Sequence, residues 1–433
     1  MSSRPPSRTP SRSVSSASLP SRRNTVSHVS PIEQTAIDAK TAAITSACET
    51  RDLDTLASLA TSSRGLINDS LRRAAWPVLL GCFREPLAEA SWRHLPLHPD
   101  EAQVALDVNR AFVYYPKNGT QCPIANTTAE SDKQLDRRKE ELSDVIIEVL
   151  RRYPFLSYFQ GYHDIVQVFL LVLARDAPLA VTRLSLFRIR DFMLPTFDPA
   201  IAQLQLLLPI IEAADPVLYN HIPKDNTFFA LAGTITMFSH MVQEYSDISR
   251  LFDFFLAHDT VVPVYFFAAV ILSRRDELLE IEKEDQDILH AILGKLPQPF
   301  DLEFQIARTV ELHERLSPAA LRSWAWWQIS SSSVLKTTST PFQITRTSLQ
   351  EAEQLFHQQE KDLQRRQALQ RAFVTAKLVR GRLWYYRRPT AYGIAVAVGI
   401  YAILLGRGGG TYTRYMSLGP LGDLLKRIVG VRN

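Results

Sequence analysis

The sequence predicts an all-α protein built from many medium-length helices, and two observations support this prediction. Apolar residues recur every three or four positions along most of residues 31–330, and the pattern is clearest at 132–152. Glycine is scarce, since only six of the sixteen glycines precede residue 381. Long stretches without turn residues argue against β-sandwiches and barrels, because those folds need frequent turns.

Further apolar stripes recur along the chain between short segments rich in Pro, Asp and Asn. These stripes lie at 162–174, 201–212, 227–242, 250–257 and 261–273. Prolines mostly stand where one stripe ends and the next begins, as is typical of helix boundaries. We therefore expect one multi-helix domain over residues 31–330.

Both ends of this body differ from it in composition. Residues 1–30 hold eleven serines and four prolines with almost no apolar residues, which predicts a disordered tail. Residues 331–347 are rich in Ser and Thr and are predicted to form a linker. A capping box at Ser348 and Glu351 then predicts a basic helix over 348–388.

An apolar segment near the C-terminus predicts a membrane anchor at 389–406. Thr390–Gly406 is seventeen residues without a charge, which as a helix would be ~26 Å long, close to the roughly 27 Å core of the endoplasmic reticulum bilayer. More basic residues lie on the N-terminal side of this segment than on its C-terminal side, so the large N-terminal part should face the cytosol. We expect a single-pass endoplasmic reticulum membrane protein, followed by a short tail at 407–433 with an amphipathic segment.

Charge is distributed very unevenly along the chain. The formal net charge of +4 divides into +5 for residues 1–30, −13 for 31–360 and +12 for 361–433. An acidic central body argues against nucleic acid as a partner, because phosphate binding needs basic charge on the folded surface. The basic C-terminal part suits a lipid bilayer with an anionic cytosolic face.

The absence of their motifs argues against several kinds of catalytic and cofactor site. Neither GxGxxG nor GxxxxGK[ST] occurs, which argues against a dinucleotide enzyme or a P-loop NTPase. The three cysteines, Cys48, Cys82 and Cys122, are far apart and outside any CxxC spacing. No metal site and no bound cofactor are therefore expected.

Two segments of the helical body place an arginine at helical spacing from another distinctive residue. Arg73 and Trp76 stand three residues apart, although a buried Trp beside an Arg is more often packing than function. Asp107 and Arg110 also stand three residues apart, so Asp107 can pair with Arg110 and orient it. Such a pair alone is usually a surface salt bridge of little energetic value.

A third segment, Tyr158–Ile165, places Gln160 and Gly161 at the start of a very apolar helix. A glutamine gains nothing at this position unless its carboxamide is displayed at the exposed end of the helix. The glycine beside it removes side-chain bulk. This combination would let a large partner approach Gln160.

In this order the three segments resemble the fingerprints of the TBC-domain family of Rab GTPase-activating proteins. The family motifs are an R-x-x-x-W-like opening, I-x-x-D-x-x-R with Val104 here in place of Ile, and Y-x-Q-G. Later segments that look like family blocks run from Phe228 to His240 and from Arg250 to Leu256. The resemblance covers roughly residues 65–300. The His163-Asp164-Ile165 continuation and the C-terminal anchor are similar to the reticulum-anchored branch that acts on the ER-to-Golgi Rab.

This resemblance implies a mechanism and a partner. Arg110 and Gln160 would be the catalytic residues, an arginine finger and a glutamine finger that act on a Rab in its GTP form. Asp107, Tyr158, Gly161 and Arg73 would support them. Mg²⁺ and GTP would be held by the partner GTPase, which implies that this chain needs no cofactor of its own.

Two other functions compete with this interpretation. A TBC-like adaptor could bind a Rab without accelerating hydrolysis, but the chain keeps both the Arg and the Gln of the family motifs. An HD-type metal phosphohydrolase is suggested by His163-Asp164 and His258-Asp259. That site needs a further His and Asp at the metal, and neither His94 nor His98 has a helical relation to the pairs.

Overall fold

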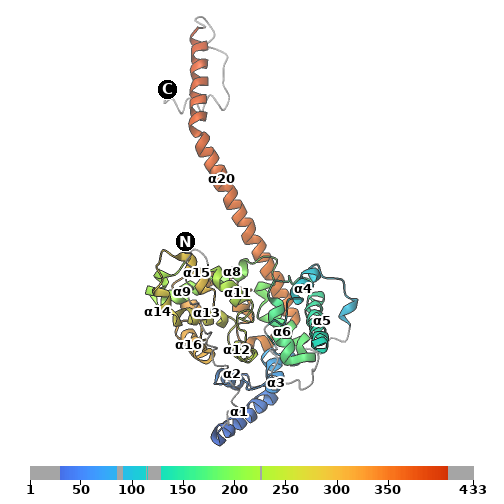
Figure 1. The fold of residues 1–433 in the computed structure, drawn as a ribbon. Coiled ribbons are helices and arrows are strands. Elements are labelled where there is room, and N and C mark those ends of the chain that lie inside the picture. Colours follow the sequence, from blue (N-terminus) through green and yellow to red (C-terminus); the bar gives the residue numbers. More distant parts are fainter. Residues whose placement is uncertain (1–29, 85–90, 114, 116–127, 225–226, 408–433) are drawn as a thin grey trace, which may run out of the picture. The chain divides into compact units, whose positions relative to one another are not determined.

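The computed structural model describes residues 30–84, 91–113, 115, 128–224 and 227–407. Within these residues every regular element is a helix, which confirms the all-α prediction (Figure 1). The chain forms two compact units, Met1–Phe356 and His357–Asn433. The predicted disordered tail at 1–30 and the tail at 407–433 lie almost entirely outside the described residues.

The helices of the larger unit are mostly between one and four turns long, as the spacing of the apolar stripes predicted. Short 3₁₀ helices are labelled η. From the N-terminus the elements are α1 (Pro31–Thr50), α2 (Leu53–Thr61), α3 (Asp69–Leu79), η1 (Cys82–Arg84), η2 (Trp92–His94), α4 (Glu101–Val108) and α5 (Thr128–Arg152). The middle of the chain forms α6 (Tyr162–Leu173), η3 (Ala174–Asp176), α7 (Ala177–Phe187), η4 (Arg190–Phe192), α8 (Asp198–Leu204), α9 (Leu207–Ala214), α10 (Pro216–His221), η5 (Phe228–Ala230), α11 (Leu231–Ile235), α12 (Tyr245–Ala257) and α13 (Val262–Ser273). The C-terminal part forms α14 (Arg275–Leu279), α15 (Gln286–Leu293), α16 (Leu302–Arg315), η6 (Pro318–Ala320), α17 (Ala325–Gln328), α18 (Val334–Thr337), α19 (Pro341–Arg346) and α20 (Leu349–Arg407).

Polar side chains one residue ahead of several helices explain where those helices begin. Asp52, Asn68 and Asp301 each accept a hydrogen bond from the backbone N–H three residues further on. Such a bond satisfies an N–H that has no partner inside the helix. The predicted capping box at Ser348 and Glu351 is confirmed, because the Glu351 carboxylate also accepts the Ser348 N–H at 2.7 Å.

The core of the larger unit is formed around α6, α12 and α13, whose side chains are buried nearly throughout. Trp76 of α3 is fully buried, with its ring centroid 5.2 Å from that of Phe169 on α6 and 6.0 Å from that of Phe252 on α12. Aromatic rings of this size contribute large apolar areas to a core. Helix α6 is therefore held by packing along most of its length.

A buried carboxylate, Asp253 of α12, ties α3 and α12 together. Its oxygens accept from the Arg72 guanidinium at 3.0 Å, the Trp76 indole N–H at 2.8 Å and the Leu66 backbone N–H at 3.0 Å. The arginine that shares this carboxylate with Trp76 is Arg72, whereas the sequence singled out Arg73. A buried charge is tolerated only when it is paired and hydrogen-bonded in this way.

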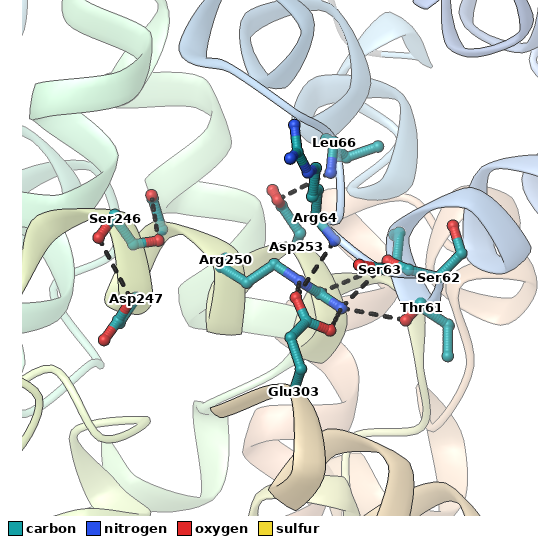
Figure 2. A network of polar contacts seen from close by, with 12 residues as sticks. Thr61, Ser62, Ser63, Arg64, Leu66, Ser246, Asp247, Arg250, Asp253 and Glu303 are labelled. Carbon is teal, nitrogen blue, oxygen red and sulfur yellow. Dashed lines mark hydrogen bonds and ion pairs between the residues drawn. The ribbon is translucent and has the colours of Figure 1, made fainter. Parts of the chain in front are cut away.

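Arg250, one turn earlier on α12, fixes the end of α2 (Figure 2). Its guanidinium donates to the carbonyls of Ala60 and Thr61 at 2.8 and 3.0 Å and forms an ion pair with Glu303 of α16 at 2.8 Å. Because α2 lacks partners for its last carbonyls, an arginine placed there stabilises the helix end.

The prediction of a linker at 331–347 is wrong. This segment forms α18 and α19, and Val334, Leu335 and Ile344 are buried. Arg190 donates to the Ser332 carbonyl at 2.7 Å, and Asp191 accepts from the Val334 N–H at 3.1 Å. The serines and threonines satisfy buried polar groups, so the domain continues past 330 to Phe356.

Helix α20 is one continuous helix, where the sequence predicted a basic helix and a separate membrane segment. Its first turns belong to the larger unit, since Ala352 and Phe356 are buried there. Further on, the apolar side chains of Tyr392–Tyr401 are exposed. By length and composition, the described chain holds one stretch that could cross a membrane, Tyr162–Phe187, and 67% of its apolar window is buried within the protein.

Removal of the Asp253 carboxylate tests its role in joining α3 to α12. Asp253→Ala takes the fully buried carboxylate away from Arg72, which keeps its less buried partner Asp69, and removes the acceptor of the Trp76 indole N–H. The free energy of unfolding should therefore fall by about 3–5 kcal/mol. Urea denaturation followed by circular dichroism measures this change. Asp276→Ala is the control, because the Asp276 side chain is 94% exposed, and it should change stability by less than about 0.5 kcal/mol. Equal stability of the two variants would contradict the assignment.

Candidate functional site

Gln160 stands in a tight turn immediately before α6. Phe159 and Tyr162 on either side are buried, whereas Gln160 itself is exposed. Gly161 has a φ of 105°, a backbone conformation that side chains with a Cβ rarely adopt. A Cβ on Gly161 would also lie 2.7 Å from Thr236 Cγ2. The glycine therefore allows the turn that displays the Gln160 carboxamide.

Arg110 lies just after the end of α4 and is also exposed. Its backbone N–H donates to the Asp107 carbonyl at 3.0 Å, which continues the last turn of the helix. Within the described part of the chain, its guanidinium has no ion pair or hydrogen bond. An arginine in this state is available for an anionic group of a partner. The neighbouring stretch Pro116–Asn126 lies outside the described residues.

The Asp107 carboxylate does not pair with Arg110 as the sequence predicted. It is buried, and it accepts from the Tyr158 hydroxyl at 3.0 Å and from the Gln103 amide at 3.2 Å. The spacing permits an Asp107–Arg110 pair on a helix, but the Tyr158 hydroxyl is the partner that offsets the cost of desolvating the carboxylate. Asp107 therefore joins α4 to the glutamine-bearing turn.

Tyr158 connects the two candidate residues through its backbone and its side chain. Its N–H donates to the Asp100 carboxylate at 2.9 Å, and its hydroxyl lies 3.2 Å from His163 Nδ1. Burial, and then the Asp107 charge, raise the pKa of Tyr158, so the hydroxyl stays a neutral donor. Tyr158 is two residues before Gln160, and α4 ends two residues before Arg110, so these bonds bring the two segments together.

Arg73 lies away from this network. It is exposed, and its Nε donates to the Val172 carbonyl at 2.7 Å, near the C-terminal end of α6. A donor at that position satisfies a carbonyl of the last helical turn. Its contact supports α6 from the end opposite to Gln160.

His240 contacts the first turn of α6, and the sequence did not single it out for function. Its Nδ1 lies 3.0 Å from the Asp164 carboxylate, in the first turn of α6. The hydrogen bond with Asp164 raises the pKa of His240. The side chain of Thr236, four residues before His240, packs at Gly161. The family-like block that ends at His240 was the available signal, but it did not reveal this pairing.

The two His-Asp dipeptides have different surroundings and do not converge. Asp164 faces His240, whereas His258 bonds the Thr61 hydroxyl and Asp259 lies 3.5 Å from His313. Burial lowers the pKa of His258 to about 4. Across the residues that the structure describes, no group of three or more His, Cys, Asp or Glu is arranged to hold a metal ion. This geometry gives no support to a metal phosphohydrolase.

Comparison with known proteins identifies the class to which this fold and site belong. A profile of the Rab-GTPase-TBC domain matches residues 69–279, a range that includes Asp107, Arg110, Tyr158 and Gln160. The chain belongs to this family, and it is a Rab GTPase-activating TBC domain protein whose partner is a Rab GTPase.

Similar individual proteins occur in mammals and in fission yeast. TBC1 domain family member 20 of Bos taurus is 35% identical over 300 residues, which are 68% of this chain and 72% of that protein. The Mus musculus protein of the same name is 33% identical over 356 residues, 81% of this chain and 84% of that protein. GTPase-activating protein gyp10 of Schizosaccharomyces pombe is 33% identical over 305 residues, 67% of this chain and 76% of that protein.

The His240–Asp164 pair predicts a specific dependence on pH. Because the folded state raises the pKa of His240, the pair stabilises the fold fully below the unfolded value of about 6.5. That contribution is lost as the pH rises through the folded pKa. NMR titration of the histidine rings should show a lower His240 pKa in Asp164→Asn than in the parent protein. An unchanged His240 titration would mean that Asp164 does not hold the proton on the ring.

Proposed function

We propose that this protein accelerates GTP hydrolysis by a Rab in its GTP form through two fingers, Arg110 and Gln160. The observation that carries this proposal is their common setting. Both side chains are exposed, and the segments that bear them are joined by the partly buried Tyr158–Asp107 hydrogen bond. In the described part of the chain neither side chain has a polar partner, and two such side chains on joined segments suit a phosphate site brought by a partner.

The chemistry of GTP hydrolysis explains why an arginine and a glutamine are needed. A small GTPase is slow because negative charge on the phosphoryl oxygens is not neutralised and the attacking water is poorly oriented. The Arg110 guanidinium would neutralise that charge with a planar fork of donors that a lysine lacks. The Gln160 carboxamide would accept from and donate to the water, in place of the glutamine of the GTPase itself.

The partner would bring the nucleotide and its Mg²⁺. In small GTPases both are held by the phosphate loop and neighbouring residues of the GTPase. The roles of this chain are then to supply charge, to orient water and to exclude solvent from the phosphates. An arginine supplied in trans contributes up to ~10⁵ in rate, which is roughly 7 kcal/mol of activation free energy.

Single-turnover hydrolysis by a panel of GTP-loaded Rabs tests the two fingers. Arg110→Ala should reduce the acceleration of the responsive Rab by about 10³-fold or more, and Gln160→Ala by about 10²-fold. Arg308→Ala, which removes another exposed arginine, is the matched control and should keep full activity. Acceleration that survives both finger variants would refute the mechanism, and a Rab that binds without acceleration would favour an adaptor.

We further propose that the protein is anchored in the endoplasmic reticulum membrane through residues 389–406, and that it regulates early secretory traffic from there. Support comes from the end of α20, where the side chains of Tyr392–Tyr401 are apolar and exposed all around the helix. A helix with no polar face is expected to be covered by protein or lipid. The excess of basic residues before this segment favours a cytosolic N-terminal domain.

Deletion of residues 389–433 tests the anchor. The truncated protein should move from the membrane pellet to the soluble fraction after cell fractionation, because it loses the apolar segment. The full chain should resist extraction by carbonate and co-fractionate with endoplasmic reticulum membranes. A truncated protein that stays in the pellet, or a full chain extracted by carbonate, would disprove the anchor.

A further inference from the structure

The turn that carries Arg110 is held by α6, the helix that begins directly after Gln160 and Gly161. Gln167 lies on α6, seven residues after Gln160, and only 3% of it is exposed. Its Oε1 accepts a hydrogen bond from the Phe112 backbone N–H at 2.8 Å. The contact is thus made two residues after Arg110 and between segments 55 residues apart in sequence.

Phe112 needs this external partner because of its own backbone conformation. Its φ is 62°, in the left-handed region that a bulky residue seldom enters. Such strain persists only where surrounding contacts hold it. The N–H of Phe112 points to the buried amide of Gln167, so that bond fixes the direction in which the chain leaves Arg110.

Two further contacts hold the chain on either side of Arg110. Lys139 of α5 donates to the Asn109 carbonyl at 2.9 Å, just before Arg110. The hydroxyl of Tyr115 donates to the Ser239 carbonyl at 2.6 Å. Of the contacts from Gln167 and Lys139, the Gln167 contact is the more buried, since the Lys139 contact is exposed.

A buried glutamine in this position would be costly without such a partner. Its neighbours Ile165, Val166, Val168 and Phe169 are all fully buried and apolar. A leucine or valine would fill the same space without the cost of desolvating an amide. The hydrogen bond to the Arg110 turn accounts for the amide.

We infer that Gln167 is a positioning residue, which couples the placement of Arg110 to the helix that displays Gln160. This inference rests on the proposed two-finger mechanism. Gln167 is buried, so it would act only through the backbone of the Arg110 turn. Because α6 is packed along most of its length, it would hold both fingers in place. They would then approach the nucleotide site of a Rab in a fixed arrangement.

Steady-state kinetics of the full-length protein with the responsive GTP-loaded Rab test this inference. Gln167→Met keeps the length and burial of the side chain but removes the acceptor. A misplaced finger costs transition-state stabilisation rather than binding, so kcat should fall about 10- to 100-fold while KM changes less than about threefold. Gln167→Glu keeps an acceptor oxygen and should restore most of kcat.

Two controls separate positioning from general damage to the fold. Val168→Ala removes buried volume from the same helix but leaves the Gln167–Phe112 hydrogen bond in place, and it should keep kcat. In an Arg110→Ala background, Gln167→Met should have no further effect on rate, because it acts through Arg110. Equal losses from Gln167→Met with and without Arg110, or a wild-type kcat for Gln167→Met, would overturn the inference. If Arg110→Ala itself kept full activity, the two-finger proposal would fail instead.

Discussion

At Gly161 the backbone takes a φ of 105°, and α6 begins with the next residue. The arrangement of the candidate site depends on this turn. It lets the chain pass from buried Phe159 to buried Tyr162 while Gln160 alone remains exposed. A larger residue at 161 would both strain the backbone and collide with Thr236. The glutamine is thus presented by a conformation that the core on both sides enforces.

Several buried arginines of this protein hold the fold together, and Arg110 differs from them. Arg72, Arg183, Arg190 and Arg250 are buried and bond to carboxylates or backbone carbonyls, and they join distant segments of the fold. Arg110 is exposed, and in the described part of the chain its guanidinium has no such bond. An arginine that must neutralise charge on a partner cannot be committed to its own fold. Its backbone is fixed instead, through the contacts of Asn109 and Phe112.

The sequence predicted the parts of this structure that depend on local pattern. The recurrence of apolar residues about every 3.6 positions predicted α5, and the apolar stripe after Gln160 and Gly161 predicted α6. Non-local partners decided the rest. Arg72 and Arg73 are adjacent, and only Asp253, about 180 residues away, determines which of them is buried. Segment 331–347 has the composition of a linker, but contacts from η4 bury it.

The same distinction applies to the site itself. The motifs identified Arg110, Gln160 and Tyr158, but they could not show that Asp107 would bond Tyr158 rather than Arg110. A lone glutamine in the apolar stripe of α6 was the available signal for Gln167. Its partner, the Phe112 N–H, is a backbone group, and no pattern of side chains reveals it.

The most direct measurement of the central claim uses a Rab whose own catalytic glutamine is replaced by leucine. If Gln160 orients the attacking water, the protein should still accelerate hydrolysis by this GTP-loaded Rab variant to within about tenfold of the unmodified Rab. Acceleration should then disappear with Gln160→Ala. A Rab variant that shows no response to this protein, while the unmodified Rab responds fully, would contradict the two-finger account.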